Sequence, residues 1–162
     1  MTIKYLDSKR IRGSSAGSVG TQTYNAGALT NVTLSNNNLT ATATSSSWGN
    51  KAYSTLTFNP DNIASGEVYQ FTFTTSDDTK NGMVGFDKAP ASNSGAGNST
   101  MDFGMYLVGN ASNQNYISTA GGGSENWNGG QAYTTSSVLK MTMDSSGNVK
   151  FYIGGTQFGN TI

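Results

Sequence analysis

Histidine and cysteine are both absent from the 162 residues of this chain. Without an imidazole or a thiol, the chain has no Ser-His or Cys-His nucleophile, no imidazole base near neutral pH, and neither a histidine nor a thiolate ligand for zinc. Disulfide bonds are excluded for the same reason. We therefore expect a binding or structural protein rather than an enzyme.

Long apolar runs are also absent. No run approaches the roughly 20 residues of a transmembrane helix, and the first seven residues lack the continuous apolar core of a signal peptide. We expect a soluble protein that does not insert into a membrane and is not exported by the usual route.

The chain has a formal net charge of zero, with nine basic and nine acidic residues. As a whole it gives no electrostatic reason to expect nucleic acid or an anionic membrane as a partner. The charges are distributed unevenly, however. Residues 1–12 carry four cations against Asp7, and the rest of the chain has five basic and eight acidic residues. The first twelve residues and the remainder are therefore electrostatically complementary.

Short runs of Val, Ile, Leu, Phe and Tyr alternate with stretches rich in Gly, Ser, Thr and Asn. This composition disfavours helices of three turns, and no helical periodicity is visible. Roughly ten short strands without intervening helices predict an all-β fold, specifically an antiparallel β-sandwich or jelly roll. The expected strands include residues 29–35, 39–43, 51–58, 68–74, 82–86, 102–108, 116–118, 138–143 and 149–153.

Turn residues predict two hairpins. Asn36-Asn37 connects the first two strands, and the segment from Asp144 to Gly147 connects the last two. Alternation within residues 68–74 predicts one buried face. The side chains assigned to packing are Trp48, Tyr69, Phe71, Phe73, Phe86, Phe151 and Ile153.

Residues 13–20, with the sequence GSSAGSVG, predict a flexible linker. We therefore expect two parts in the chain. Residues 1–24 form an extended N-terminal arm with its linker, and residues 25–162 form the sandwich domain.

Five short motifs follow one another along the chain: LSNNNLTAT at 34–42, WG at 48–49, SGEVYQF at 65–71, MVGF at 83–86 and DSSGNVKFYIGG at 144–155. Together they resemble the SPRY-like domains of the concanavalin A-like lectin/glucanase superfamily. The resemblance implies a concanavalin A-like jelly roll.

The sequence YLDSKRIRG at 5–13 is similar to a leader found on structural proteins of environmental tailed phages and related viruses. This resemblance implies a virion component assembled in the host cytoplasm, such as a capsid decoration, tail-fibre or adhesion protein.

Two features depart from the SPRY-like pattern. Gln70-Phe71 replaces an aromatic-Glu pair, and the chain stops at Ile162, where such domains continue for another strand or two. We therefore expect a sheet with an unpaired edge, which a strand from another chain would cover, the N-terminal arm being a candidate donor.

The carboxylates do not form the pair that glucanases of the superfamily use, which lies about 5 to 5.5 Å apart in retaining enzymes. Glu67 and Glu125 are the glutamates of the chain, and neither lies in a closely spaced acidic strand motif. Asp102 has no acidic neighbour at alternate positions. We expect no hydrolase activity and no catalytic residues.

Acidic and amide side chains between strands have two interpretations. Asp77-Asp78, followed by Lys80 and Asn81, could give oxygen ligands to calcium. The same residue types cap their own backbone in turns, and we favour the turn here, at Asp61-Asn62 and at Asp144. No metal and no cofactor are expected.

Trp127 is the main candidate for a carbohydrate site. Its ring could stack on a sugar while Glu125, Asn126 and Asn128 bind hydroxyls, and the glycines around it make it accessible. The alternative, that Trp127 folds over the end of the sandwich and plugs the core, is slightly favoured. Tyr116, preceded by Asn113-Gln114-Asn115, is a second, weaker polar-aromatic candidate.

The N-terminal arm is the candidate for assembly, since its cations could dock on the acidic body of a neighbouring subunit. Binding to nucleic acid is disfavoured, because the basic run is short and Tyr5 is its one stacking aromatic. The arm residues assigned to assembly are Lys4, Tyr5, Leu6, Lys9, Arg10, Ile11 and Arg12.

The leading hypothesis is a non-enzymatic virion structural protein that assembles with copies of itself or with other virion proteins. One alternative is a carbohydrate-binding module that adheres to a host glycan at an extracellular surface. A second alternative is a subunit of an extracellular filament that polymerises by strand donation.

Overall fold

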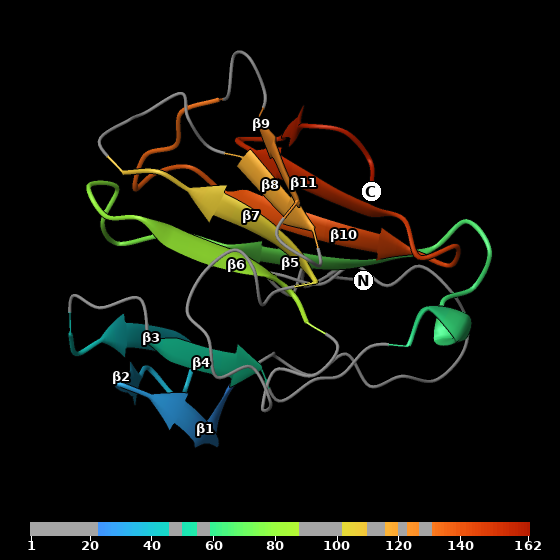
Figure 1. The fold of residues 1–162 in the computed structure, drawn as a ribbon. Helices are drawn as coiled ribbons and strands as arrows, with labels where there is room; N and C mark the ends of the chain where they lie inside the picture. Colours follow the sequence, from blue (N-terminus) through green and yellow to red (C-terminus); the bar gives the residue numbers. More distant parts are fainter. Residues whose placement is uncertain are drawn as a thin grey trace, which may run out of the picture.

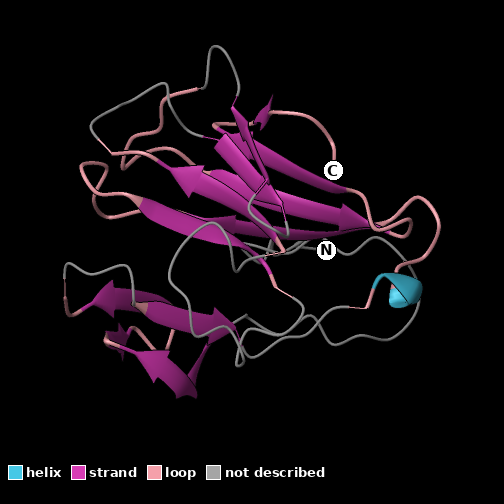
Figure 2. Cartoon of the chain, viewed as in Figure 1, coloured by secondary structure: helices cyan, strands magenta, loops and turns pink. Residues whose placement is uncertain are grey.

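A computed structural model describes residues 23–45, 50–54, 59–87, 102–109, 116–119, 123–126 and 131–162. This part of the chain is all-β, as predicted, and its one helical element is the short 3-10 turn η1 (Pro60–Asn62) (Figure 2). None of these residues belongs to a helix with the length and hydrophobicity needed to cross a membrane. The predicted assembly arm, Trp48, Trp127 and Asn128 lie outside the described residues.

Eight strands form two four-stranded antiparallel sheets, which we call the body (Figure 1). The first sheet has the order β12-β11-β10-β5, with bounds Thr156–Phe158, Val149–Ile153, Leu139–Asp144 and Val68–Phe73. The second has the order β6-β7-β8-β9, with bounds Gly82–Phe86, Phe103–Leu107, Tyr116–Thr119 and Gly123–Asn126.

Four strands precede the body and form the N-terminal region. β1 (Tyr24–Thr30) pairs with β4 (Lys51–Ser54), and β2 (Val32–Ser35) pairs with β3 (Thr40–Ala43). Both are two-stranded antiparallel sheets, and Figure 1 shows them below the body in blue to teal.

The first predicted hairpin is confirmed between β2 and β3, with one change. Asn31 has a φ of 51° and ends β1, so the predicted strand over 29–35 is divided between β1 and β2. The connecting turn has positive φ at Asn36, Asn37 and Asn38, and the Leu39 amide donates to the Asn36 carbonyl at 3.1 Å. Asparagine tolerates this left-handed backbone better than most residues, which explains the repeated asparagines.

The body has a single cluster of buried apolar side chains, to which both four-stranded sheets contribute. In β11 the buried positions alternate with half-buried Lys150 and Tyr152, as the two-residue period of a strand requires. In β10 the apolar positions are buried and Thr142 is buried as well. Phe71 of β5 and Phe86 of β6 meet edge to face, with ring centroids 5.6 Å apart. The buried residues are Ile63, Met105, Leu107, Ile117, Tyr133, Leu139, Met141, Met143, Val149, Phe151, Ile153 and Phe158.

The predicted packing residues behave as expected where the structure describes them. Phe151 and Ile153 are buried, and Tyr69, Phe71, Phe73 and Phe86 pack against the buried cluster. The second predicted hairpin is confirmed, with β10 and β11 paired from Leu139↔Ile153 to Met143↔Val149.

The strands β9 and β12 were not predicted. Gly154 and Gly155, with φ of 58° and 87°, turn the chain after β11 so that β12 pairs back onto it. Farther along, Val149 and Ile162 exchange two backbone hydrogen bonds of 2.8 and 3.0 Å. The unpredicted strand β12 therefore covers the outer edge of β11, and β12 and β5 are the outer strands of this sheet in the described residues. The expectation that a strand from another chain covers a sheet edge stays a prediction.

Candidate functional site

The strand directions bring several connections to one end of the body, which we call the loop end. Phe73 at the end of β5 pairs with Leu139, which begins β10, and Gly82 at the start of β6 pairs with Leu107, which ends β7. Tyr116, which begins β8, pairs with Tyr106 near the end of β7 and with Asn126, which ends β9. The β5–β6, β7–β8 and β9–β10 connections therefore all start or finish at the loop end. Loops clustered on a rigid sheet scaffold are where binding residues are commonly found.

Tyr133 joins the two sheets at the loop end. Its side chain is 1% exposed, and its hydroxyl donates to the Lys80 carbonyl oxygen at 3.0 Å. Burial raises the pKa of Tyr133, and the negative charges of Asp78 and Asp77 raise it further. The Thr135 amide donates to Asp78 at 3.3 Å. These contacts fix the segment after β9 against the β5–β6 connection.

Asn81 links the start of β6 to the end of β7. Its side-chain oxygen accepts the Gly109 amide at 2.9 Å, and its side-chain nitrogen lies 3.4 Å from the Tyr106 hydroxyl. A Cβ atom at Gly109 would lie 2.3 Å from the carbonyl carbon and oxygen of Thr79. Only glycine fits this close approach of two backbones.

The turn interpretation of Asp77 is confirmed. One oxygen of Asp77 accepts both the Thr79 amide at 2.8 Å and the Thr79 hydroxyl at 2.6 Å. These hydrogen bonds, the side-chain one first, lower the pKa of Asp77. In the described segments no group of three or more acidic side chains is arranged to hold a metal ion.

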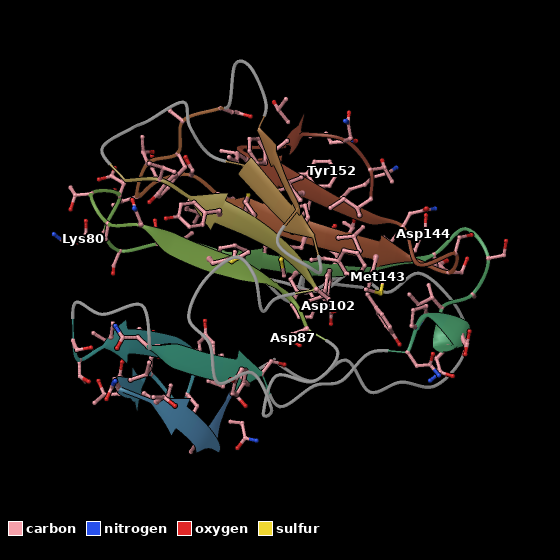
Figure 3. All side chains as sticks on the ribbon, viewed as in Figure 1. Lys80, Asp87, Asp102, Met143, Asp144 and Tyr152 are labelled. Atoms are coloured by element: carbon pink, nitrogen blue, oxygen red, sulfur yellow. The ribbon has the colours of Figure 1, made fainter. Side chains whose placement is uncertain are left out.

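Asp144 also closes a turn. One carboxylate oxygen accepts the amides of Ser146 and Asn148 at 2.9 and 3.0 Å, and the other accepts the Asn148 side-chain amide at 2.8 Å. The Asn148 side chain is the largest cause of the lowered pKa of Asp144. Gly147 has the positive φ, 81°, that completes this turn. Figure 3 shows Asp144 at the opposite end of the body from Lys80.

Asp61 lies in η1, where the Asn59 side chain accepts the Asp61 amide at 3.0 Å. The capping carboxamide therefore comes from Asn59, one residue before the proline that begins the helical turn. The prediction of a turn at Asp61-Asn62 is confirmed.

Part of the predicted carbohydrate site is brought together by β8 and β9. Tyr116 and Asn126 are directly opposite each other, and Glu125 is opposite Ile117. Because successive residues of a strand alternate between faces, Glu125 occupies a different face from the Tyr116 and Asn126 positions. The strand β9 ends at Asn126, at the loop end, and Trp127 follows it outside the described residues.

Two acidic residues come together across strands, which a search along the sequence could not reveal. The last pair of β6 and β7 is Phe86↔Phe103, so Asp87 and Asp102 flank it on the same side (Figure 3). The pKa of Tyr53 in β4 is raised by burial and by the charge of Asp87. Antiparallel pairing, rather than sequence spacing, makes Asp102 a neighbour of another carboxylate.

The outer face of the first sheet was also missed. It turns away from the buried cluster and carries polar and aromatic side chains, and we call it the outer sheet face. Lys140 Nζ lies 3.8 Å from the centroid of the Tyr152 ring on this face. Alternation within β10 and β11 is the sequence signal that could have identified it. Its residues are Val68, Gln70, Thr72, Lys140, Thr142, Asp144, Lys150, Tyr152 and Gln157.

Comparison with known proteins gives no relative for this arrangement. No protein-family model matches the chain, and no curated protein or solved structure matches it.

Proposed function

We propose that this protein is a non-enzymatic structural subunit of a virion, a capsid decoration or tail-fibre component, that assembles through its N-terminal arm and its edge strands. The observation that carries the proposal is the distribution of burial. Every buried apolar side chain of the described chain lies at or after Ile63, and none of the described side chains between 23 and 54 is buried. The described part of this segment has no core of its own, so contact with a partner surface would stabilise it.

The N-terminal region shows this need in its strands. Val32 and Leu34 are half-buried on one face of β2, and Ala41 is half-buried on β3 opposite Leu34. A two-stranded sheet is at best marginally stable in water and requires packing against another element. Contact with a neighbouring subunit would provide that packing.

The charge distribution indicates which parts of neighbouring subunits would contact each other. Residues 1–12 carry a surplus of three positive charges, and the remainder carries an equal surplus of negative charges. Complementary charges between subunits accelerate encounter and fix the register of an interface. The basic arm of one subunit would dock on the acidic body of the next.

The proposal includes a more specific fold for the body, a concanavalin A-like jelly-roll sandwich. It is supported by the two four-stranded antiparallel sheets, which contribute to one apolar cluster. Two sheets that share a core are the defining arrangement of a sandwich.

The test is the mass of the full chain in solution by light scattering, beside a variant lacking residues 1–12. We expect a large oligomer that becomes a monomer when the arm is removed. A second variant, with Lys4, Lys9, Arg10 and Arg12 replaced by Gln, keeps the length of the arm and removes its charge. Monomers for all three proteins would contradict the proposal.

A carbohydrate-binding adhesion module is the second candidate. Its favourable observation is that β7 and β9 end, and β8 and β10 begin, at the loop end, where Tyr116 and Asn126 are strand partners. Under this function Trp127→Ala abolishes retention on a glycan array, with Tyr133→Phe as a loop-end control. Retained binding by Trp127→Ala would exclude this site.

A further inference from the structure

The outer sheet face has a regular arrangement set by strand register. One row crosses all four strands of the first sheet, and a second row lies two residues farther along the strands. The first row is Gln157, Tyr152, Lys140 and Thr72, and the second is Lys150, Thr142 and Gln70. With strands about 4.8 Å apart, the first row spans roughly 14 Å. The face is therefore long enough to contact an extended ligand.

The centre of this face is closely packed. Thr142 is 7% exposed although it points away from the core, and it lies between Lys150 and Gln70. Lys140 and Tyr152, which are partners in the neighbouring row, are half-buried. In the two rows the side chains other than exposed Gln157 are at least half-buried, which lowers the entropy lost on binding.

Lys140 and Tyr152 form a defined pair. They are cross-strand partners, and the ammonium group lies over the ring at 3.8 Å from its centroid. The ring restrains the lysine but does not neutralise its charge. The ammonium hydrogens that do not face the ring can donate to a negatively charged oxygen.

The outer sheet face has a net positive charge although the chain is neutral. Its two cations, Lys140 and Lys150, outnumber the one carboxylate, Asp144, which lies on the same face at the end of β10. Both oxygens of Asp144 accept hydrogen bonds from its own turn, and its charge is attracted to Lys150. Lys140 is therefore the less compensated cation.

We propose that the outer sheet face binds an anionic saccharide, one that carries a carboxylate or a sulfate on its sugar rings. Lys140 and Lys150 pair with the anionic groups, the Tyr152 edge and hydroxyl contact a sugar ring, and Gln70, Thr72 and Gln157 bind hydroxyls. None of these residues belongs to the predicted Trp127 site or to the predicted N-terminal arm. The inference goes beyond the proposed function and stands apart from it.

The test measures binding of the full chain to matched pairs of saccharides by titration calorimetry. The probes are a galacturonic acid tetrasaccharide and its methyl ester, and sialyllactose and lactose. We expect the acidic member of at least one pair to bind at least about tenfold more tightly than its neutral partner. Equal affinity for the acidic and neutral members, or no binding of any of them, would overturn the proposal.

Variants locate the site. Lys140→Gln is expected to weaken binding of the acidic saccharide about tenfold, and Tyr152→Phe to weaken it less because the ring remains. Lys51→Gln removes the same charge from β4 and should leave affinity unchanged. Equal losses for Lys140→Gln and Lys51→Gln would show a nonspecific charge effect and overturn the assignment.

Light scattering separates this inference from the assembly proposal. Lys140→Gln should leave the mass of the particle unchanged while it weakens saccharide binding. A loss of the oligomer in Lys140→Gln would identify the face as a contact between copies and overturn saccharide binding there. Loss of acidic-saccharide binding in Trp127→Ala but not in Lys140→Gln would overturn it in favour of the loop end.

Discussion

The N-terminal region and the body are both made of short antiparallel strands, yet they differ in how their side chains are buried. The body buries twelve apolar side chains in one cluster, and the described N-terminal region buries none. The apolar residues of β1 to β3, such as Leu29, Val32 and Leu34, are half-buried. Strand pairing without a shared core therefore gives secondary structure but little stability of its own.

The turns of the two regions differ as well. In the body, the carboxylates of Asp77 and Asp144 accept backbone amides and close their turns. In the N-terminal region, three asparagines with positive φ form the β2–β3 turn, and residues 23–54 contain no acidic residue. The same geometric task is thus performed by a titratable group in one region and by a neutral group in the other.

The largest effect on this comparison is expected from truncating one apolar side chain in each region. Phe151 is completely buried in β11, so Phe151→Ala should lower the free energy of unfolding by about 3–5 kcal/mol through lost burial and a residual cavity. Val32 in β2 is half-buried, so Val32→Ala should cost less than about 1 kcal/mol. Urea unfolding measures both. Equal losses would show that the N-terminal region has a core comparable to that of the body.

A smaller effect is expected from adding a methyl group to a glycine in each region. Gly109→Ala forces a Cβ atom to 2.3 Å from the Thr79 carbonyl and should cost about 1–3 kcal/mol. Gly27→Ala in β1 meets its nearest atom, on Asn25, at 3.4 Å, and should change stability by no more than about 0.5 kcal/mol. Thermal unfolding of both variants tests the difference. A tolerated Gly109→Ala would mean that the loop end is not rigid.

The smallest effect is the pH dependence of the turns. The pKa values of Asp77 and Asp144 are lowered in the folded protein, so their stabilising contribution is present above the unfolded value of 3.8 and is lost as the pH falls through the folded value. The midpoint temperature of thermal unfolding should therefore decrease when the pH is lowered past about 4. This decrease should be smaller in the double variant Asp77→Asn and Asp144→Asn.

The matched control for this titration is Asn36→Ala in the β2–β3 turn, which contains no acidic group. This variant should change the midpoint temperature by the same amount at every pH, so the shape of its stability-against-pH profile stays that of the unmodified protein. An unchanged profile in the double aspartate variant would show that other carboxylates cause the acid sensitivity.

Much of the body was predictable because its strands obey local rules. Tyr69, Phe71 and Phe73 share one face through simple alternation, and Asp144 and Gly147 supply the chemistry that their turn needs. Gly82–Phe86 was predicted with its observed bounds. The strands β9 and β12 were missed because each has three or four residues and little apolar character, and a partner strand is what makes them strands.

The candidate sites were less predictable for a related reason. Tyr116 and Asn126 were chosen for their chemistry, and only the β8–β9 register makes them neighbours. The contact between Lys140 and Tyr152 joins two strands, and the approach of Asp87 to Asp102 joins two others. None of these pairs is marked by sequence spacing.

By itself, the sequence determined the all-β class, the turns closed by asparagine, aspartate and glycine, and the alternation that divides each strand into an apolar and a polar face. These features depend on backbone preferences and on interactions between residues a few positions apart. The tertiary structure decided which strands pair, which polar faces become continuous, and that burial is concentrated after Ile63. Those properties depend on contacts between distant segments, whose register is set only when the apolar faces pack together.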